Sequence, residues 1–196
     1  MNPTRRTVAV AGHTGDVSTA RSGLASDDAG VRSTALGALE RLGELSDDDV
    51  SDALADAEPG VRRRAAEVAA THPGVDLLGA LHDDDARVVE VAAWSCGEHE
   101  SDRDEIVERL IELAGSADDP LVRESSVAAL GAIGDERAVA AILAATADKP
   151  AVRRRAVLAL APFDGDEVED AMERALVDRD WQVRQAAEDL RRAYRS

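Results

Sequence analysis

The acidic run near position 83 is the first candidate for chemistry. His82 is followed by Asp83, Asp84 and Asp85, and hard cations such as Ca²⁺ prefer carboxylate oxygens as ligands. A calcium loop spaces its acids as Asp-x-Asp-x-Asp-Gly, and this run lacks that spacing. We therefore predict a solvated turn that ends in a helix cap, and no metal site. No other stretch places a nucleophile, a base and an orienting group together, so we predict no catalytic residues and no cofactor.

A second candidate is the stretch from Val8 to Asp16, which could be a strand that runs into a phosphate-binding loop. The Gly-Lys-Ser/Thr that such a loop needs to bind phosphate does not follow. The same stretch aligns with the end of a later helix: Val8, Gly12, Gly15 and Asp16 match Val127, Gly131, Gly134 and Asp135. We therefore expect a leading helix over residues 2–14, with Asn2 and Pro3 as its cap and first turn.

The stretch from Asp119 to Asp135 is the pattern that the chain repeats. Asp119 is a helix cap, Pro120 stands at the first helical position, and Gly134 ends the helix. The apolar position of its first turn recurs every 27–34 residues, as Val31, Val61, Val88, Val122, Val152 and Val183. A small residue follows four places later, where a neighbouring helix must approach closely: Ala35, Ala65, Ala92, Ser126, Ala156 and Ala187. A fixed period of about thirty residues is typical of a solenoid.

The repeats divide the chain into one leading helix and six helix pairs within a single domain. The pairs cover residues 15–44, 45–73, 74–100, 101–134, 135–164 and 165–195. The first helix of each pair is expected to be the shorter one, over residues 16–25, 47–55, 75–81, 104–113, 136–145 and 166–177. The third pair is irregular, because a polar link over residues 98–103 follows it, and we expect a longer loop there.

Arginine follows the repeated valine in five of six repeats, as Arg32, Arg62, Arg123, Arg153 and Arg184. An acidic helix cap stands three places before most of these valines, as in Asp28, Asp85, Asp119 and Asp180. Acids are favoured at helix N-termini. We expect the arginines and caps of successive repeats to form a structural ladder rather than a binding patch.

Positions two and six places after the valine should face the inner groove of the solenoid. The candidate groove residues are Arg63, Glu90, Trp94, Glu124 and Arg154. An exposed Trp94 would anchor a partner, and a Trp94 turned inward would only fill space. Charges of both signs alternate on this face, whereas nucleic acid needs a run of one sign, so nucleic acid is an improbable partner.

The composition is strongly acidic and poor in lysine. The formal net charge is -17, with 40 acidic and 23 basic residues, and Lys149 is the single lysine. Such a surface suits a salt-rich cytoplasm, where salt screens the repulsion between like charges. A merely acidic solenoid at ordinary salt is the alternative interpretation.

The salt hypothesis predicts a melting temperature that rises from dilute buffer to molar salt, because screening relieves the repulsion between carboxylates. Thermal unfolding followed by circular dichroism at increasing potassium chloride concentrations measures it. A melting temperature that does not change with salt would contradict the hypothesis.

The location of the protein is indicated by two further features. Cys96 is the single cysteine, so no intrachain disulfide can form. No apolar run approaches the ~20 residues that span a bilayer, and the first residues are a poor match to a secretion signal. We expect a soluble cytoplasmic protein.

The repeated Asp-x-x-Val-Arg-x-x-Ala resembles the HEAT-like repeats of the phycobilisome (PBS) lyase type. The resemblance covers nearly the whole chain and is closest over residues 119–135 and 149–160. It implies a right-handed all-α solenoid. Some relatives are hydroxylases that bind two irons through several His-Glu pairs, and others are lyases that attach or detach bilin. This chain has the single pair His99-Glu100, and Cys96 occupies a position where other repeats carry leucine.

The sequence therefore favours a non-enzymatic scaffold whose concave groove binds a protein or peptide, without metal or cofactor. A bilin lyase-like or metal-dependent hydroxylase-like enzyme, or a subunit of one, is the alternative that the resemblance leaves open.

Overall fold

The computed structural model describes residues 3–99 and 103–193, and these residues form helices and connecting turns without a strand. This is the all-α helical-repeat architecture expected from the thirty-residue period. The predicted second helices are all present. With the leading helix they are α1 (Arg5–Thr14), α3 (Ala29–Leu42), α5 (Pro59–Ala69), α6 (Ala86–Glu98), α8 (Pro120–Ile133), α10 (Pro150–Ala159) and α12 (Trp181–Ala193).

The first helices are shorter, as expected, and one of them differs from the prediction. They are α2 (Val17–Gly23), α4 (Asp47–Leu54), α7 (Asp104–Ser116), α9 (Val139–Ala145) and α11 (Asp166–Ala175), with a 3₁₀ turn η2 (Glu136–Ala138) leading into α9. The helix predicted over residues 75–81 is wrong. A single 3₁₀ turn, η1 (Ala80–His82), stands there, because Pro73, Gly74 and Gly79 leave too short a stretch for a helix to nucleate.

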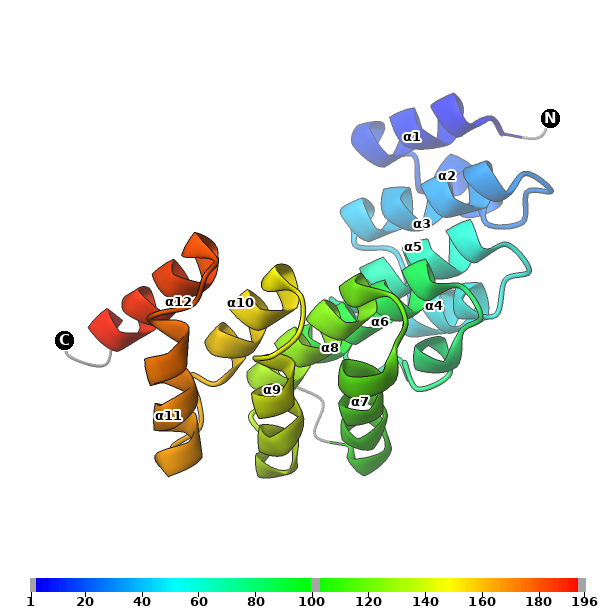
Figure 1. Ribbon diagram of the computed structural model, residues 1–196. Helices are drawn as coiled ribbons and strands as arrows, with labels where there is room; N and C mark the ends of the chain where they lie inside the picture. Colours follow the sequence, from blue (N-terminus) through cyan, green and yellow to red (C-terminus); the bar gives the residue numbers. More distant parts are fainter. Residues whose placement is uncertain (1–2, 100–102, 194–196) are drawn as a thin grey trace. The chain divides into compact units, whose positions relative to one another are not determined.

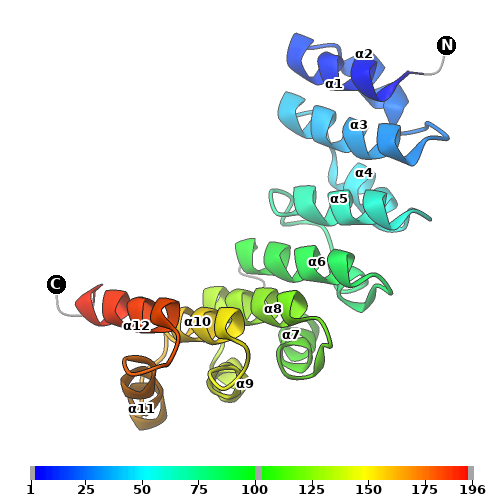
Figure 2. The ribbon, with the colours of Figure 1, turned by 45° about the horizontal axis from the view of Figure 1, so that its top comes forward.

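The chain divides into two compact units, residues 1–95 (unit 1) and residues 96–196 (unit 2). In unit 1, α1 packs on α3 and α3 on α5, with α2 and α4 packed against these helices. In unit 2, α8 packs on α10 and α10 on α12, with α7, α9 and α11 alongside (Figure 1). Figure 2 shows the second helices of each unit lying side by side in order. The grouping of all repeats into one domain stays a prediction.

The repeated small positions lie where the helices meet. Every repeated valine is buried, and so is each small residue four places later. Glycine brings the helices still closer: a Cβ on Gly131 would lie 2.6 Å from Cα of Ala159, and a Cβ on Gly97 would lie 2.9 Å from Cα of Ala129. Neighbouring second helices are therefore in backbone contact, which is why alanine and glycine replace the large aromatic side chains of an ordinary core.

The helix ends follow the capping residues in the sequence. The carboxylate of Asp119 accepts a hydrogen bond from the backbone N–H of Leu121, and Gly134 ends α8 with the positive φ of 71° that glycine favours. The leading helix begins later than expected, at Arg5 instead of residue 2 or 3. Thr4 caps it, because the side chains of Thr4 and Thr7 each bond the backbone N–H of the other. Asn2 lies outside the described residues.

Candidate functional site

Each arginine of the ladder joins three segments of the chain. In the first rung, Nε and Nη2 of Arg32 donate to the two carboxylate oxygens of Asp56, both at 2.7 Å. Nη1 of Arg32 donates to the backbone carbonyls of Ser26 and Asp27, at 2.9 and 3.2 Å. The guanidinium thus fastens the loop before its own helix to the loop of the next repeat, and the fork geometry suits a carboxylate.

The same rung recurs along the chain. Arg62 pairs with Asp83, Arg123 with Asp148 and Arg153 with Asp178, each through two nitrogens, and each arginine also donates to carbonyls of its own loop. The aspartates accept a second kind of bond. Asp56, Asp83 and Asp178 each accept the backbone N–H of the residue two places later, where the next second helix is capped. Each rung therefore also fixes the start of the following helix.

The ladder acids differ from those expected. Asp28, Asp85, Asp119 and Asp180 accept backbone N–H bonds within the first turns of their own helices and do not pair with the ladder arginines. The pairing acids instead lie one or two places before the cap position, in the loop. The expectation was wrong here because a cap carboxylate is already directed at its own helix, whereas a loop carboxylate remains free to bond the arginine of the preceding repeat.

One rung of the ladder is missing, between the third and the fourth repeat. In the third repeat Val89 stands where arginine is expected, and in the fourth repeat Ala117 stands where the accepting aspartate would be. At the other end, Nη1 of Arg184 donates to the carbonyls of Asp178 and Arg179 as in every rung. No described carboxylate pairs with Arg184. Between the third and fourth repeats the arginine is therefore absent, although Asp118 stands at the place that the accepting Asp148 occupies in its repeat.

Ion pairing lowers the pKa of the ladder carboxylates. The hydrogen bond from each arginine is the largest cause, and it holds the pKa of Asp56, Asp83, Asp148 and Asp178 below the ordinary value for aspartate. The arginines are half-buried, and Arg153 is 5% exposed. These pairs are therefore better shielded from water than ordinary surface pairs.

The predicted groove residues of unit 1 lie on α5 and α6. Arg63 and Trp94 are exposed and Glu90 is half-buried. Trp94 is 41% exposed, although its neighbours Ala93 and Ser95 are both buried. The open question about Trp94 is thus answered in favour of exposure. Whether these residues form a partner-binding site stays a prediction.

The predicted groove residues of unit 2 lie within reach of one another. Glu124 on α8 is 3.7 Å from Nη2 of Arg154 and from Nη2 of Arg155, both on α10. Arg155 was missed at the sequence level because only positions two and six places after the valine were considered. The position three places after the valine lies near the same face, and in unit 1 it adds Arg64, which pairs with Glu67 at 2.8 Å.

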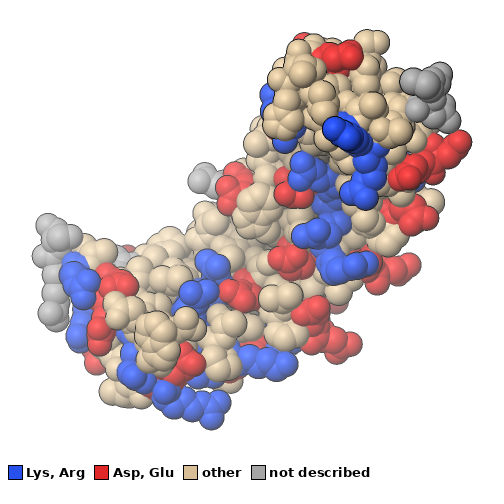
Figure 3. Space-filling model, turned by 90° about the horizontal axis from the view of Figure 1, so that it is seen from above, with Lys and Arg blue, Asp and Glu red and all other residues tan. Residues whose placement is uncertain are grey.

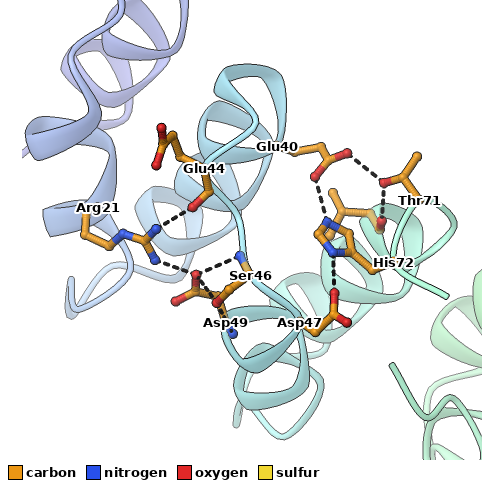
Figure 4. A network of polar contacts seen from close by, with 9 residues as sticks. Arg21, Glu40, Glu44, Ser46, Asp47, Asp49, Thr71 and His72 are labelled. Atoms are coloured by element: carbon orange, nitrogen blue, oxygen red, sulfur yellow. Dashed lines mark hydrogen bonds and ion pairs between the residues drawn. The ribbon is translucent and has the colours of Figure 1, made fainter. Parts of the chain in front are cut away.

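A histidine between two carboxylates ties three helices of unit 1 together (Figure 4). Nε2 of His72 lies 2.9 Å from Glu40, at the end of α3, and Nδ1 lies 2.7 Å from Asp47, at the start of α4. Thr71 donates to the other oxygen of Glu40 at 2.6 Å. Burial opposes charge on His72, but the bonds to both carboxylates outweigh it, so the pKa of His72 is raised. No local motif indicates this network, because it depends on a contact between different repeats.

The other side chains that could take part in catalysis or bind a metal are ladder residues, helix caps or buried residues. Asp83 belongs to the ladder and Asp85 caps α6, so the acidic run after His82 is a capped turn. Within residues 3–99 and 103–193, no three histidine, cysteine or acidic side chains are grouped to hold a metal. Cys96 is buried. Glu100, the partner in the His-Glu pair, lies outside the described residues.

The last repeat exposes apolar surface. Trp181 is 64% exposed, so it does not shield the core of the last repeat. Its place at the first position of α12 turns it outward. An open hollow of about 400 Å³ lies in unit 2 between α11, α12 and the loop before α11. Its apolar lining includes Leu160, Phe163, Val168, Met172, Leu176 and Leu190.

Among the described helices, none is both long and apolar enough to cross a membrane.

Comparison with known proteins supports the repeat fold. A family model described as HEAT repeats matches residues 75–151. No curated protein sequence matches the chain at a significant level. The family match includes the third repeat, whose sequence is the least regular.

Solved structures with the same fold include natural and engineered proteins. An engineered protein is similar with a TM-score of 0.68 at 20% identity, over 89% of this chain and 96% of that one. The YibA protein of Escherichia coli gives 0.68 at 19% identity, over 92% and 71%. A designed armadillo repeat protein in complex with the peptide (KR)4 gives 0.68 at 17% identity, over 91% and 99%. At these identities the likeness shows the fold alone.

The rung geometry predicts that Arg153→Met is more costly than Arg184→Met. The first change leaves Asp178 and a loop carbonyl without their donors and should cost about 2–3 kcal/mol of unfolding free energy. The second removes only carbonyl bonds and should cost about 1 kcal/mol. Urea unfolding of both variants measures the difference, and equal losses would show that the aspartate contributes little.

The His72 network predicts stability that declines as the pH rises. Because the pKa of His72 is raised by folding, its contribution is complete below the ordinary value of about 6.5 and is lost as the pH passes through the raised value. His72→Gln should lower the unfolding free energy by about 1–2 kcal/mol near pH 6. The difference in unfolding free energy between the variant and the wild type should then narrow towards pH 9. Urea titrations across this range test it, and parallel pH profiles would refute it.

Proposed function

We propose that this protein is a non-enzymatic helical-repeat scaffold that binds a protein or peptide along the inner face of its second helices. The exposed indole of Trp94 is the observation that carries the proposal. The residues on either side of it in α6, Ala93 and Ser95, are buried. The exposed indole itself does not contribute to the packing of the helix. Tryptophan and arginine are the residues that most often dominate binding energy at protein interfaces.

The residues around Trp94 support a binding role. Arg63 on α5 and Glu90 on α6 place charges of both signs on the same face of unit 1. In unit 2, Glu124 and Arg154 belong to the corresponding position of α8 and α10. A row of second helices repeats these positions at regular intervals, which suits an extended segment better than a small molecule.

The solved structures add a precedent for this use of the fold. The structure of the designed armadillo repeat protein is in complex with the peptide (KR)4, and its similarity extends over most of both chains. That precedent motivates a peptide partner here but does not identify one.

Two finer interpretations accompany the proposal. The repeat period of about thirty residues, shorter than the ~40 of ordinary HEAT repeats, favours the PBS lyase subtype. The acidic, lysine-poor composition and the single buried cysteine favour the cytoplasm of a salt-adapted cell. A pigment that copurifies with the protein would redirect the first interpretation towards bilin chemistry.

The proposal predicts that Trp94→Ala weakens peptide binding about tenfold or more, because a buried aromatic anchor contributes ~2 kcal/mol. Peptides selected from a displayed random library against the wild-type protein provide the ligands. Their affinities for both proteins are then measured by calorimetry.

Trp181→Ala is the control, since it removes the other exposed indole, which belongs to unit 2. Peptides that bind wild type and the Trp94 variant alike would refute the proposed surface. Retained helicity in both variants shows that any loss is not caused by unfolding.

A further inference from the structure

Four arginines of unit 1 have no acidic partner, although the chain carries a net charge of -17. Arg21, Arg32, Arg62, Arg64 and Arg87 are each paired with a carboxylate. The unpaired ones are all exposed and make no hydrogen bond or ion pair with a described residue: Arg5, Arg6, Arg41 and Arg63. With acids in such excess, arginines that form no ion pair indicate a surface where positive charge is left uncompensated.

The helical register places these arginines on the inner side of the helices. Arg63 lies two places after the valine of its repeat, Arg64 three places and Arg41 ten places. At 100° per residue, positions three, six and ten lie within about 60° of one another, and position two lies about 40° beyond. Arg5 and Arg6 correspond to positions two and three, because Val8 aligns with Val127. Trp94 occupies position six on α6.

Contacts between helices bring the arginines together across the row. Three of the arginine side chains, those of Arg5, Arg41 and Arg64, lie against a glycine of a neighbouring helix, where a Cβ would meet them. A Cβ on Gly30 of α3 would lie 3.0 Å from Cδ of Arg5, and one on Gly12 of α1 would lie 3.1 Å from Nη1 of Arg41. The guanidinium of Arg64 covers Gly37 in the same way. The stems therefore bridge α1, α3 and α5.

The aromatic side chain lies at the end of this row. The hydroxyl of Ser95 donates to the carbonyl of Ala66 at 2.6 Å, which holds α6 against α5 beside the Arg64–Glu67 pair. Trp94 precedes Ser95 and is exposed. We call the surface formed by Arg5, Arg6, Arg41, Arg63, Arg64 and Trp94 the arginine face. All of its residues belong to unit 1.

The charge of the arginine face is opposite to that of the whole chain. Five arginines stand against three acids of the same positions, Glu67, Glu90 and Glu98, whereas acids exceed bases over the complete sequence. Figure 3 shows basic side chains gathered in a band over unit 1, with acidic side chains beside it. A partner of negative charge is therefore attracted to this band and repelled from its surroundings.

We propose that the arginine face binds an acidic peptide segment in an extended conformation, with carboxylates on the arginine forks and an apolar side chain on Trp94. The inference rests on the proposed function and names its partner class. Arginine binds carboxylates through two parallel bonds in every rung of this protein, so the same chemistry is available to Arg41 and Arg63. Glu67 and Glu90 space the positive charges, which suits separated carboxylates better than a continuous row of phosphates.

The test measures the anisotropy of a fluorescein-labelled peptide of about twelve residues, enough to cross four helices ~10 Å apart when extended. The peptide carries glutamates and one leucine among glycine and serine. The double variant Arg41→Ser, Arg63→Ser should bind it at least about tenfold more weakly than wild type.

The control variant Arg174→Ser, Arg191→Ser removes the same charge from exposed positions of unit 2 and should leave the affinity unchanged. An equal loss in both double variants would overturn the inference, since net charge alone would explain it. So would tighter binding of a single-stranded oligonucleotide of similar length.

A lysine-containing peptide of the same design separates the two proposals. If that peptide binds, and only Trp94→Ala weakens it, the scaffold proposal stands and the acidic partner is refuted. If the glutamate peptide alone binds, and both the arginine and the Trp94 variants weaken it, the inference is supported.

Discussion

The bidentate bond between an arginine and the loop aspartate of the next repeat is the constraint on which the repeats depend. A lone exposed ion pair contributes about 0–1 kcal/mol and would not define a fold. The rung does more, because the third arginine nitrogen satisfies loop carbonyls and the aspartate also accepts the N–H at the start of the following helix. One half-buried guanidinium therefore fixes two loops and the entry of a helix, in the absence of large apolar side chains at these ends.

This use of arginine also determines where binding residues can stand. The ladder arginines lie one place after the valine, at the loop edge of each second helix, and their donors are occupied. Positions two, three, six and ten are not used by the ladder. The exposed Arg63 and Trp94 occupy two of these positions. No bidentate rung joins the third and fourth repeats, because Val89 stands in place of the ladder arginine.

Much of the fold, and less of the site, could be predicted from the sequence. Val31 and its equivalents are buried because period and size alone specify the stripe, and Gly134 ends α8 for local conformational reasons. The pairing of Arg32 with Asp56 instead of a cap could not be predicted, because loop geometry between two repeats selects the acid. The network of His72 with Glu40 and Asp47 has the same origin. Local sequence patterns specify the helices, whereas side-chain contacts between repeats depend on how the loops are arranged in space.

The distribution of charge also separates the arginines that hold loops together from the arginines that form no ion pair. A chain with many acids and few bases has enough carboxylates to neutralise every arginine, and unit 1 does so at its loops and ladder. Arg5 and Arg41 lie against glycines of the adjacent helices and form no ion pair with a described residue, and the exposed Arg63 forms none either. Leaving these guanidinium groups solvated costs the folded protein little, since water hydrates them well. Their positive potential is thus retained at a surface where no ion pair within the protein neutralises it.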